Sequence, residues 1–349
     1  DPMQILEGVY RMTLSLRALT RRSLSMLAVA GVAALAGVTA TTSSALAQAW
    51  PARPVTIVVP FPAGGNTDTM ARLAAEYLSS KLGQQFVVEN RPTGGGIVAA
   101  AQIAKGPADG YTLFFASAGQ MVILPMMQKV NYDPETEFTP VSILGTGPFV
   151  LGVRSTLPVN NFAEFIDYAK KQKDGLNVAS AGQGAIGHLS AGLLAKRGNF
   201  PIVFVPYQGG GPAMNALINH DVDFYFGNAS ELLQHADGGR IKILAVSTLD
   251  RMKQLPNTPP VASVYPGFET SSWNGFLVAK GTPPEIVKKL MEETMAASKD
   301  PKIAGRLEAL GIKPIGSTSE EFAKIIAAER PLYKEGIEAA GIMQSRKAQ

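Results

Sequence analysis

Four glycine-rich loops are the features of this sequence with the clearest chemical potential. Each follows a short apolar run and precedes a helical pattern; they read Ala63-Gly64-Gly65-Asn66, Thr93-Gly94-Gly95-Gly96, Ala181-Gly182-Gln183-Gly184 and Gln208-Gly209-Gly210-Gly211. Backbone N–H groups and the helix dipole at such a helix start attract an anion without help from Arg or Lys. Glycines could serve tight turns alone, but four such loops together favour a site for a small carboxylate, which small residues let approach the backbone.

The third loop also matches a cofactor pattern. Gly182–Gly187 reads G-x-G-x-x-G, the dinucleotide fingerprint, and would open a helix after a strand. NAD binding further requires an acidic residue about 20 positions on, at the end of the next strand. No acid stands between Lys196 and Asp221. A secreted NAD-dependent oxidoreductase is therefore the alternative hypothesis, and the main expectation is a protein without cofactors.

Residues for other catalytic chemistry are missing or badly placed. The chain has no Cys and three His, which excludes thiolate catalysis and Cys-ligated metals and disfavours a His-rich metal site. The P-loop, G-x-S-x-G and H-E-x-x-H patterns do not occur. Ser180 and His188 lie close in sequence, but their spacing across a strand–helix turn does not define a nucleophile–base pair. We expect neither an enzyme nor a metal site.

Length and composition predict a globular protein of two domains. The 349 residues are 46% hydrophobic and 17% charged, and a domain takes roughly 150 residues. The net charge of +4 is small for this length. It gives no footprint for nucleic acid, so no nucleic-acid partner is expected.

The first 47 residues have the three-part pattern of a secretory signal peptide. Asp1 and Pro2 precede the first Met and look like a cloning remnant, and a basic stretch ends at Arg21-Arg22. An uncharged run from Leu24 to Ala40 follows, then the A-x-A-like site Ala45-Leu46-Ala47. The run is marginal for a membrane anchor, which needs about 20 apolar residues. We expect export to the periplasm and cleavage near Ala47, by the Sec or the twin-arginine route.

The rest of the chain repeats a strand, a Gly or Pro loop and a helix. Strands are predicted at residues 55–59, 86–89, 112–116, 150–153, 177–180, 202–205, 224–226, 243–246 and 273–279. Thr67 and Asp68 are the candidate N-caps of the first helix. Such alternation predicts parallel sheets with helices on both faces, and it brings the loops after the strands to one edge, where open α/β sheets bind ligands.

Seven ordered blocks carry a family resemblance. They are Pro60–Asp68, Asn90–Gly95, Asp109–Leu113, Ala179–Gly184, His188-Leu189, Val205–Gly210 and Ser272–Gly275. From about Trp50 to about Gly341 the chain resembles the Bug family, the TctC-type periplasmic solute-binding proteins of tripartite tricarboxylate transporters. The resemblance implies an α/β, type II periplasmic-binding-protein fold with two doubly wound lobes joined by a two-strand hinge. Residues 48–149 and 270–349 would form the first lobe and residues 150–269 the second.

The resemblance also implies a non-catalytic receptor whose partners are a small carboxylate and the membrane subunits of the transporter. A monomer is expected. The implied ligand-binding residues are Phe61, Ala63, Gly65, Asn66, Thr67, Asp68, Ser117, Gln120, Met121, Ser180, Ala181, Gln183, Gly184, Ala185 and Asn228. The chain departs from the family at Gly227, where an Asp is usual, and at Gln120-Met121 and Leu124-Pro125, where Thr-His and Asn-Pro are common.

These departures guide the prediction of the ligand. Phe61, Met121 and Val122 lie on or just after the predicted cleft loops, and rings pack well against Phe and Met. We therefore predict an aromatic mono- or dicarboxylate such as terephthalate over an aliphatic dicarboxylate. The competing interpretation places Met121 and Val122 in the core of a lobe, and a pure protein-interaction module would bind no small molecule.

Overall fold

The computed structural model describes residues 50–182 and 185–339 of the chain. Contacts divide the chain into two compact units, Asp1–Ala52 and Arg53–Gln349. Every strand and helix given below lies in the second unit. The predicted leader, residues 1–47, lies outside the described residues.

A first set of strands forms around β1 (Val55–Val59), which pairs in parallel with β2 (Phe86–Asn90) and β3 (Thr112–Ala116). β3 then pairs antiparallel with β9 (Ser271–Ala279), and β9 with the first part of β4 (Phe138–Arg154). β1 is rich in Val and Ile and almost wholly buried, as expected for a strand covered on both faces.

A second set of strands forms around β5 (Leu176–Ser180), which pairs in parallel with β6 (Ile202–Pro206) and β7 (Phe224–Asn228). The last part of β4 lies between β7 and β8 (Ile241–Val246) and is antiparallel to both. The predicted parallel pairing is therefore found for β1 with β2 and β3 and for β5 with β6 and β7, but not for β4 and β9. β4 and β9 run against their neighbours, because the chain passes from one set to the other through them.

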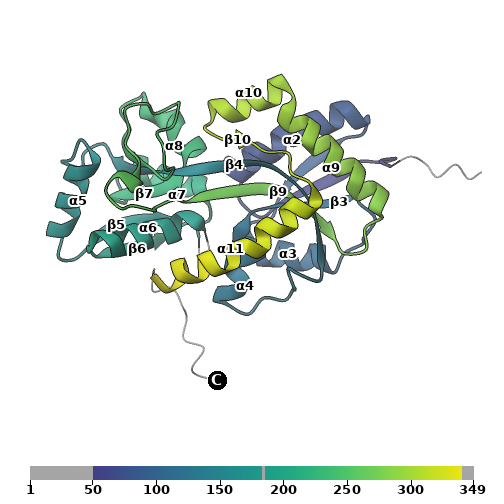
Figure 1. Cartoon of the computed structure of the whole chain (residues 1–349), viewed down its shortest axis with the longest axis horizontal. Helices are drawn as coiled ribbons and strands as arrows, with labels where there is room; N and C mark the ends of the chain where they lie inside the picture. The colour runs from purple at the N-terminus through teal and green to yellow at the C-terminus, as the bar shows by residue number, and fades with distance from the viewer. Residues whose placement is uncertain (1–49, 183–184, 340–349) are drawn as a thin grey trace, which may run out of the picture. The chain divides into compact units, whose positions relative to one another are not determined.

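β4 joins the two sets. Its register pairs Pro148 with Ser271 of β9, and the next residue, Phe149, with Asn228 of β7. The chain returns beside it, where the N–H of Thr270 donates to the carbonyl of Ser247 over 3.2 Å. Figure 1 shows β4 and β9 running side by side between the two groups of strands. This arrangement, with the similarities reported below, confirms the predicted fold class with its two-strand link.

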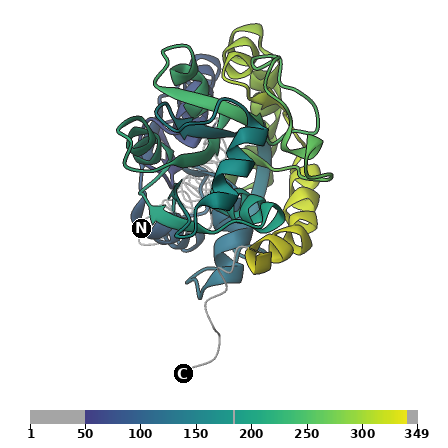
Figure 2. The same ribbon diagram turned by 90° about the vertical axis from the view of Figure 1, so that its left-hand side faces the viewer.

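Helices pack on the sheet from both faces. In Figure 2 the yellow end of the chain lies along one side, where α11 contacts α6 and β4. The helices are α2 (Asn66–Leu82), α3 (Ile97–Ala104), α4 (Leu124–Met127), α5 (Phe162–Lys171), α6 (Ile186–Gly198), α7 (Gly210–Ile218), α8 (Ala229–Ala236), α9 (Pro284–Lys299), α10 (Pro301–Ala309) and α11 (Ser319–Ala339). Short 3-10 turns occupy Thr93–Gly96 and Val261–Ser263, a π-helical turn occupies Gly119–Ile123, and the two-residue strand β10 (Lys313–Pro314) pairs with β4.

Candidate functional site

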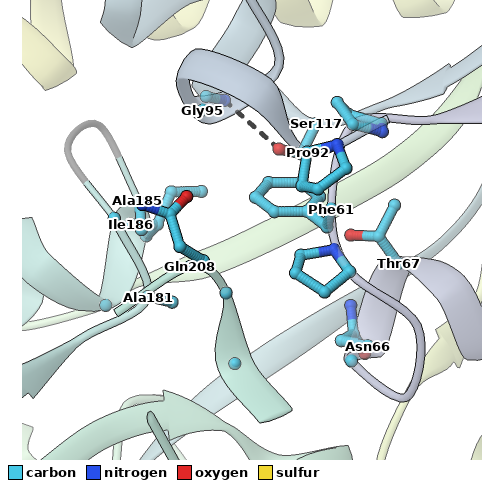
Figure 3. A pocket seen from close by; sticks show the side chains of 18 of the residues that line it. Phe61, Asn66, Thr67, Pro92, Gly95, Ser117, Ala181, Ala185, Ile186 and Gln208 are labelled. Atoms are coloured by element: carbon cyan, nitrogen blue, oxygen red, sulfur yellow. Dashed lines mark hydrogen bonds between the residues drawn. The ribbon is translucent and has the colours of Figure 1, made fainter. Parts of the chain in front are cut away.

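A cavity of about 460 Å³ lies where the loops after the strands of the two sets meet. Figure 3 shows Phe61, Pro92 and Ser117 on one side of it, and Ile186 and Gln208 on the other. The predicted ligand-binding residues that line the cavity are Phe61, Gly65, Asn66, Thr67, Ser117, Gln120, Ala181, Ala185 and Asn228. Their contact with a ligand stays a prediction.

Other predicted residues lie elsewhere. Ala63 is exposed to solvent beside the loop, and Gln183 and Gly184 lie outside the described residues. Asp68, Met121 and Ser180 are buried and do not line the cavity.

The loop before α2 is shaped by Asp68. α2 begins at Asn66 with Gly65 as its N-cap in an extended conformation, so the predicted caps Thr67 and Asp68 were placed too late in the chain. The Asp68 carboxylate accepts hydrogen bonds from the N–H of Gly64 and from Arg72, both over 2.9 Å. Burial opposes ionisation of Asp68, but these donors and Asn90 together hold its pKa below the ordinary value. Asp68 therefore holds the loop before α2 in place in its ionised form.

Met121 belongs to the core. The π-helical turn Gly119–Ile123 buries the side chains of both Met121 and Val122 completely among the aromatic and aliphatic residues of the main hydrophobic cluster. Neither side chain lines the cavity. The prediction that Met121 contacts the ligand is therefore not supported by its position, and the competing interpretation as a core residue describes it. Its neighbour Gln120 lines the cavity and donates from Nε2 to the carbonyl of Gly95 over 2.8 Å.

Ser180 and His188 form a pair behind the third glycine loop. Oγ of Ser180 lies 2.7 Å from Nδ1 of His188, and the imidazole stacks on Phe204 with 3.7 Å between ring centroids. Burial lowers the pKa of His188 to about 4, so the ring is neutral at neutral pH. Ser180 also accepts the N–H of Gly182 over 3.2 Å. The pair holds the start of the loop and leaves the serine hydroxyl behind the cavity wall.

Gly187 has a packing role in the dinucleotide-like pattern. A Cβ at this position would lie 2.1 Å from the carbonyl oxygen of Phe226, so only glycine lets α6 approach β7 this closely. The last glycine of the G-x-G-x-x-G pattern is thereby explained by helix–strand packing. That packing needs no dinucleotide.

The most informative lining residue is one that the sequence reasoning missed. Glu231, in the first turn of α8, is only 8% exposed and lines the cavity. Its Oε1 accepts the N–H of Asn66 over 3.2 Å, and its Oε2 accepts the hydroxyl of Tyr225 over 2.9 Å. Burial raises the pKa of Glu231, while hydrogen bonds from Tyr225, Asn66 and Asn228 oppose that rise. The signal in the sequence was the spacing Asn228-x-x-Glu231, which is typical of a helix capping box.

Asn66 connects three segments at this wall. Its Nδ2 donates to Oδ1 of Asn274 in β9 over 2.8 Å, and its Oδ1 accepts the hydroxyl of Ser230 in α8 over 2.7 Å. Asn274 in turn donates to Oγ1 of Thr67 over 3.0 Å. The start of α2 is therefore tied by hydrogen bonds to β9, which links the two strand sets, and to α8.

The described cavity wall carries no Lys, Arg or His side chain. An anion held there would rely on backbone N–H groups at the glycine loops and on neutral polar side chains. In the described ranges, no three His, Asp or Glu side chains come together in a way that could hold a metal ion. Among the helices described, none is long and apolar enough to cross a bilayer.

Comparisons with known proteins agree with this architecture. Residues 70–342 match the family described as tripartite tricarboxylate transporter family receptor, TctC. Protein BugT of Bordetella pertussis is 34% identical over 308 residues, which cover 87% of this chain and 94% of BugT. The solved structure of R. palustris Rpa4515 with adipate has a TM-score of 0.81 at 35% identity and covers 84% of this chain and 98% of its own. The periplasmic binding protein BugD has a TM-score of 0.80 at 34% identity, with coverages of 84% and 99%.

The fold and the cavity between two strand sets define a solute-binding protein of the periplasmic-binding type. More particularly, the chain belongs to the tripartite tricarboxylate transporter receptor family, TctC, together with the Bug proteins. Its relatives in this family are receptors that bind solutes, rather than enzymes.

Proposed function

We propose that this protein captures a small carboxylate in the periplasm and presents it to the membrane subunits of a tripartite tricarboxylate-type transporter. The observation that carries the proposal is the cavity itself: glycine loops and the start of α2 line it, and no cationic side chain does so among its described residues. The bound adipate of a structure 35% identical to this chain supports a carboxylate ligand.

Capture would involve movement of two lobes. We propose residues 48–149 and 270–349 as the first lobe and residues 150–269 as the second, because β4 changes its partners between Pro148 and Phe149. Closure about the two linking strands would enclose the ligand, as in other binding-protein clefts. Small-angle scattering tests this: the radius of gyration should fall when ligand is added, and identical curves would argue against closure.

For the ligand class, an aromatic mono- or dicarboxylate such as terephthalate is the first candidate. Phe61, Phe149, Tyr207 and Tyr225 line the cavity and offer ring surfaces for a flat ligand. Met121 does not support this choice, because its side chain lies in the core and does not line the cavity. An aliphatic dicarboxylate is the second candidate, and the adipate complex of the similar structure favours it.

A thermal-shift panel tests the proposal. Purified protein is heated with aromatic acids, aliphatic diacids and the matching neutral amides. An acid that binds the folded state raises Tm by mass action, while its amide should leave Tm unchanged. Stabilisation by NAD with no response to any acid would instead revive the oxidoreductase alternative.

A further inference from the structure

The wall of the cavity formed by α8 presents a buried carboxylate that nothing nearby neutralises. Glu231 is the one acidic side chain among the described lining residues, and no Lys, Arg or His accompanies it there. Its Oε1 also lies 3.6 Å from the position that a Cβ on Gly65 would take. The carboxylate therefore stands beside the glycine loop that the proposed ligand would use.

The partners of Glu231 are all hydrogen-bond donors. They are the N–H of Asn66, the hydroxyl of Tyr225, and the backbone and side-chain N–H groups of Asn228. Burial raises the pKa of Glu231, and each donor opposes that rise because it favours the ionised acceptor form of the carboxylate. Tyr225 and Glu231 are the titratable groups in this cluster, and their contact is a hydrogen bond from hydroxyl to carboxylate.

Asn228, the N-cap residue of α8, also lines the cavity. Its side-chain Oδ1 is a second acceptor in this region. That oxygen is buried and has no hydrogen-bond donor among the described residues.

The chain holds an internal comparison for this pattern. Asn161-x-x-Glu164 at the start of α5 has the same spacing, and there Oδ1 of Asn161 accepts the N–H of Glu164 over 2.9 Å. Both residues of that box are exposed. At α8 the N-cap makes no such side-chain bond, and the glutamate turns toward Asn66 and Tyr225 instead. Capping alone therefore does not account for the placement of Glu231.

We propose that Glu231 makes the receptor selective for acids that also carry a hydrogen-bond donor, a hydroxyl or ammonium group. This inference rests on the proposed function. A second carboxylate brought against Glu231 would meet a like charge in a site of low dielectric, which costs affinity steeply. A hydroxyl or ammonium group would instead donate a hydrogen bond to the Glu231 carboxylate.

Matched ligand pairs test this selectivity by calorimetry. Malate is compared with succinate, glutamate with glutarate, and 4-hydroxybenzoate with terephthalate, on the wild-type protein and on Glu231→Gln. In at least one pair, the wild type should bind the donor-bearing member about tenfold or more tightly, a factor typical of one charge-assisted hydrogen bond. Glu231→Gln should shrink or reverse that preference, because the amide carries no charge and can itself donate.

The variant should fold, since Gln also serves at this position of a capping box. Glu164→Gln in the exposed box of α5 is the matched control and should leave the preference intact. Acid binding without donor preference in the wild type, or a preference unchanged in Glu231→Gln, would overturn this inference alone. Failure of every acid to bind would overturn the proposed function instead.

Discussion

The backbone N–H of Asn66 donates to Oε1 of Glu231 over 3.2 Å, and this bond joins the first turn of α2 to α8 at the wall of the cavity. A free helix start attracts an anion, and here a carboxylate of the protein itself takes one of the N–H groups. The position of this carboxylate can be tested without changing Glu231 itself.

Gly210 packs directly against Glu231. A Cβ at Gly210 would lie 2.0 Å from Oε1 of Glu231, whereas one at the adjacent Gly211 would approach nothing closer than 3.8 Å. Gly210→Ala must therefore displace the carboxylate, and we expect it to change ligand affinity by about tenfold or more, which corresponds to the usual cost of overpacking. Titration calorimetry measures the change. Gly211→Ala is the control, and equal behaviour of the two variants would contradict the role assigned to Glu231.

Asp68 should stabilise the fold in a pH-dependent way. Asp68 is 3% exposed, and its burial opposes ionisation, but hydrogen bonds from Arg72, Gly64 and Asn90 outweigh the burial and lower its pKa. Its contribution is therefore complete above the unfolded pKa near 4 and is lost as the pH falls through the lower folded value.

Chemical denaturation of Asp68→Asn at pH 7 should show a loss of about 1–3 kcal/mol, the range for hydrogen bonds to a charged group. The difference in the free energy of unfolding between Asp68→Asn and the wild type should become smaller at acidic pH. Asp109→Asn, which breaks an exposed ion pair with Arg53, should cost about 1 kcal/mol or less. A loss at Asp68 that does not depend on pH would contradict this account.

His188 should produce a second pH dependence of the same sign. Burial lowers its pKa from 6.5 to about 4, so the folded protein binds fewer protons than the unfolded chain between these values. Stability should fall as the pH is lowered from about 6.5 toward 4, by up to about 3 kcal/mol from this group. Unfolding of His188→Asn across the same range should show a flatter slope. An identical slope in the variant would refute the buried, neutral imidazole.

Phe61 and Met121 should respond to mutation in opposite ways. Phe61 lines the cavity and is half-buried, so Phe61→Ala should weaken an aromatic ligand by about 1–3 kcal/mol and leave Tm nearly unchanged. Met121 is wholly buried in the core, so Met121→Ala should cost about 2–5 kcal/mol of stability. Thermal melts and calorimetry on both variants separate the effects. A stable Met121→Ala protein that loses only affinity would restore Met121 to the ligand site.

The sequence predicted most of the elements because their signals are local. The Val and Ile run predicted at residues 55–59 matches β1 at both ends. The first part of β4 was missed, since Pro140 and Pro148 interrupt a pattern that otherwise reads as a strand. The structure accommodates this segment with two register shifts against β9, which no local pattern reveals.

Site residues were harder to predict where tertiary packing decides. Met121 follows Gln120, which lines the cavity, but the π-helical turn directs the two side chains differently. Glu231 was not predicted as a site residue. Its spacing from Asn228 indicates only a local role, in a capping box. Its second role depends on Asn66, which is 165 residues away in the chain and meets it only in the fold.

Titration calorimetry of the wild-type protein with aromatic and aliphatic carboxylates, each paired with its neutral amide, tests the central claim most directly. The account predicts saturable binding of at least one acid, no binding of its amide, and the acid recovered unchanged after incubation. Absence of binding by every acid, equal binding of acid and amide, or chemical turnover of the bound acid would contradict a carboxylate receptor.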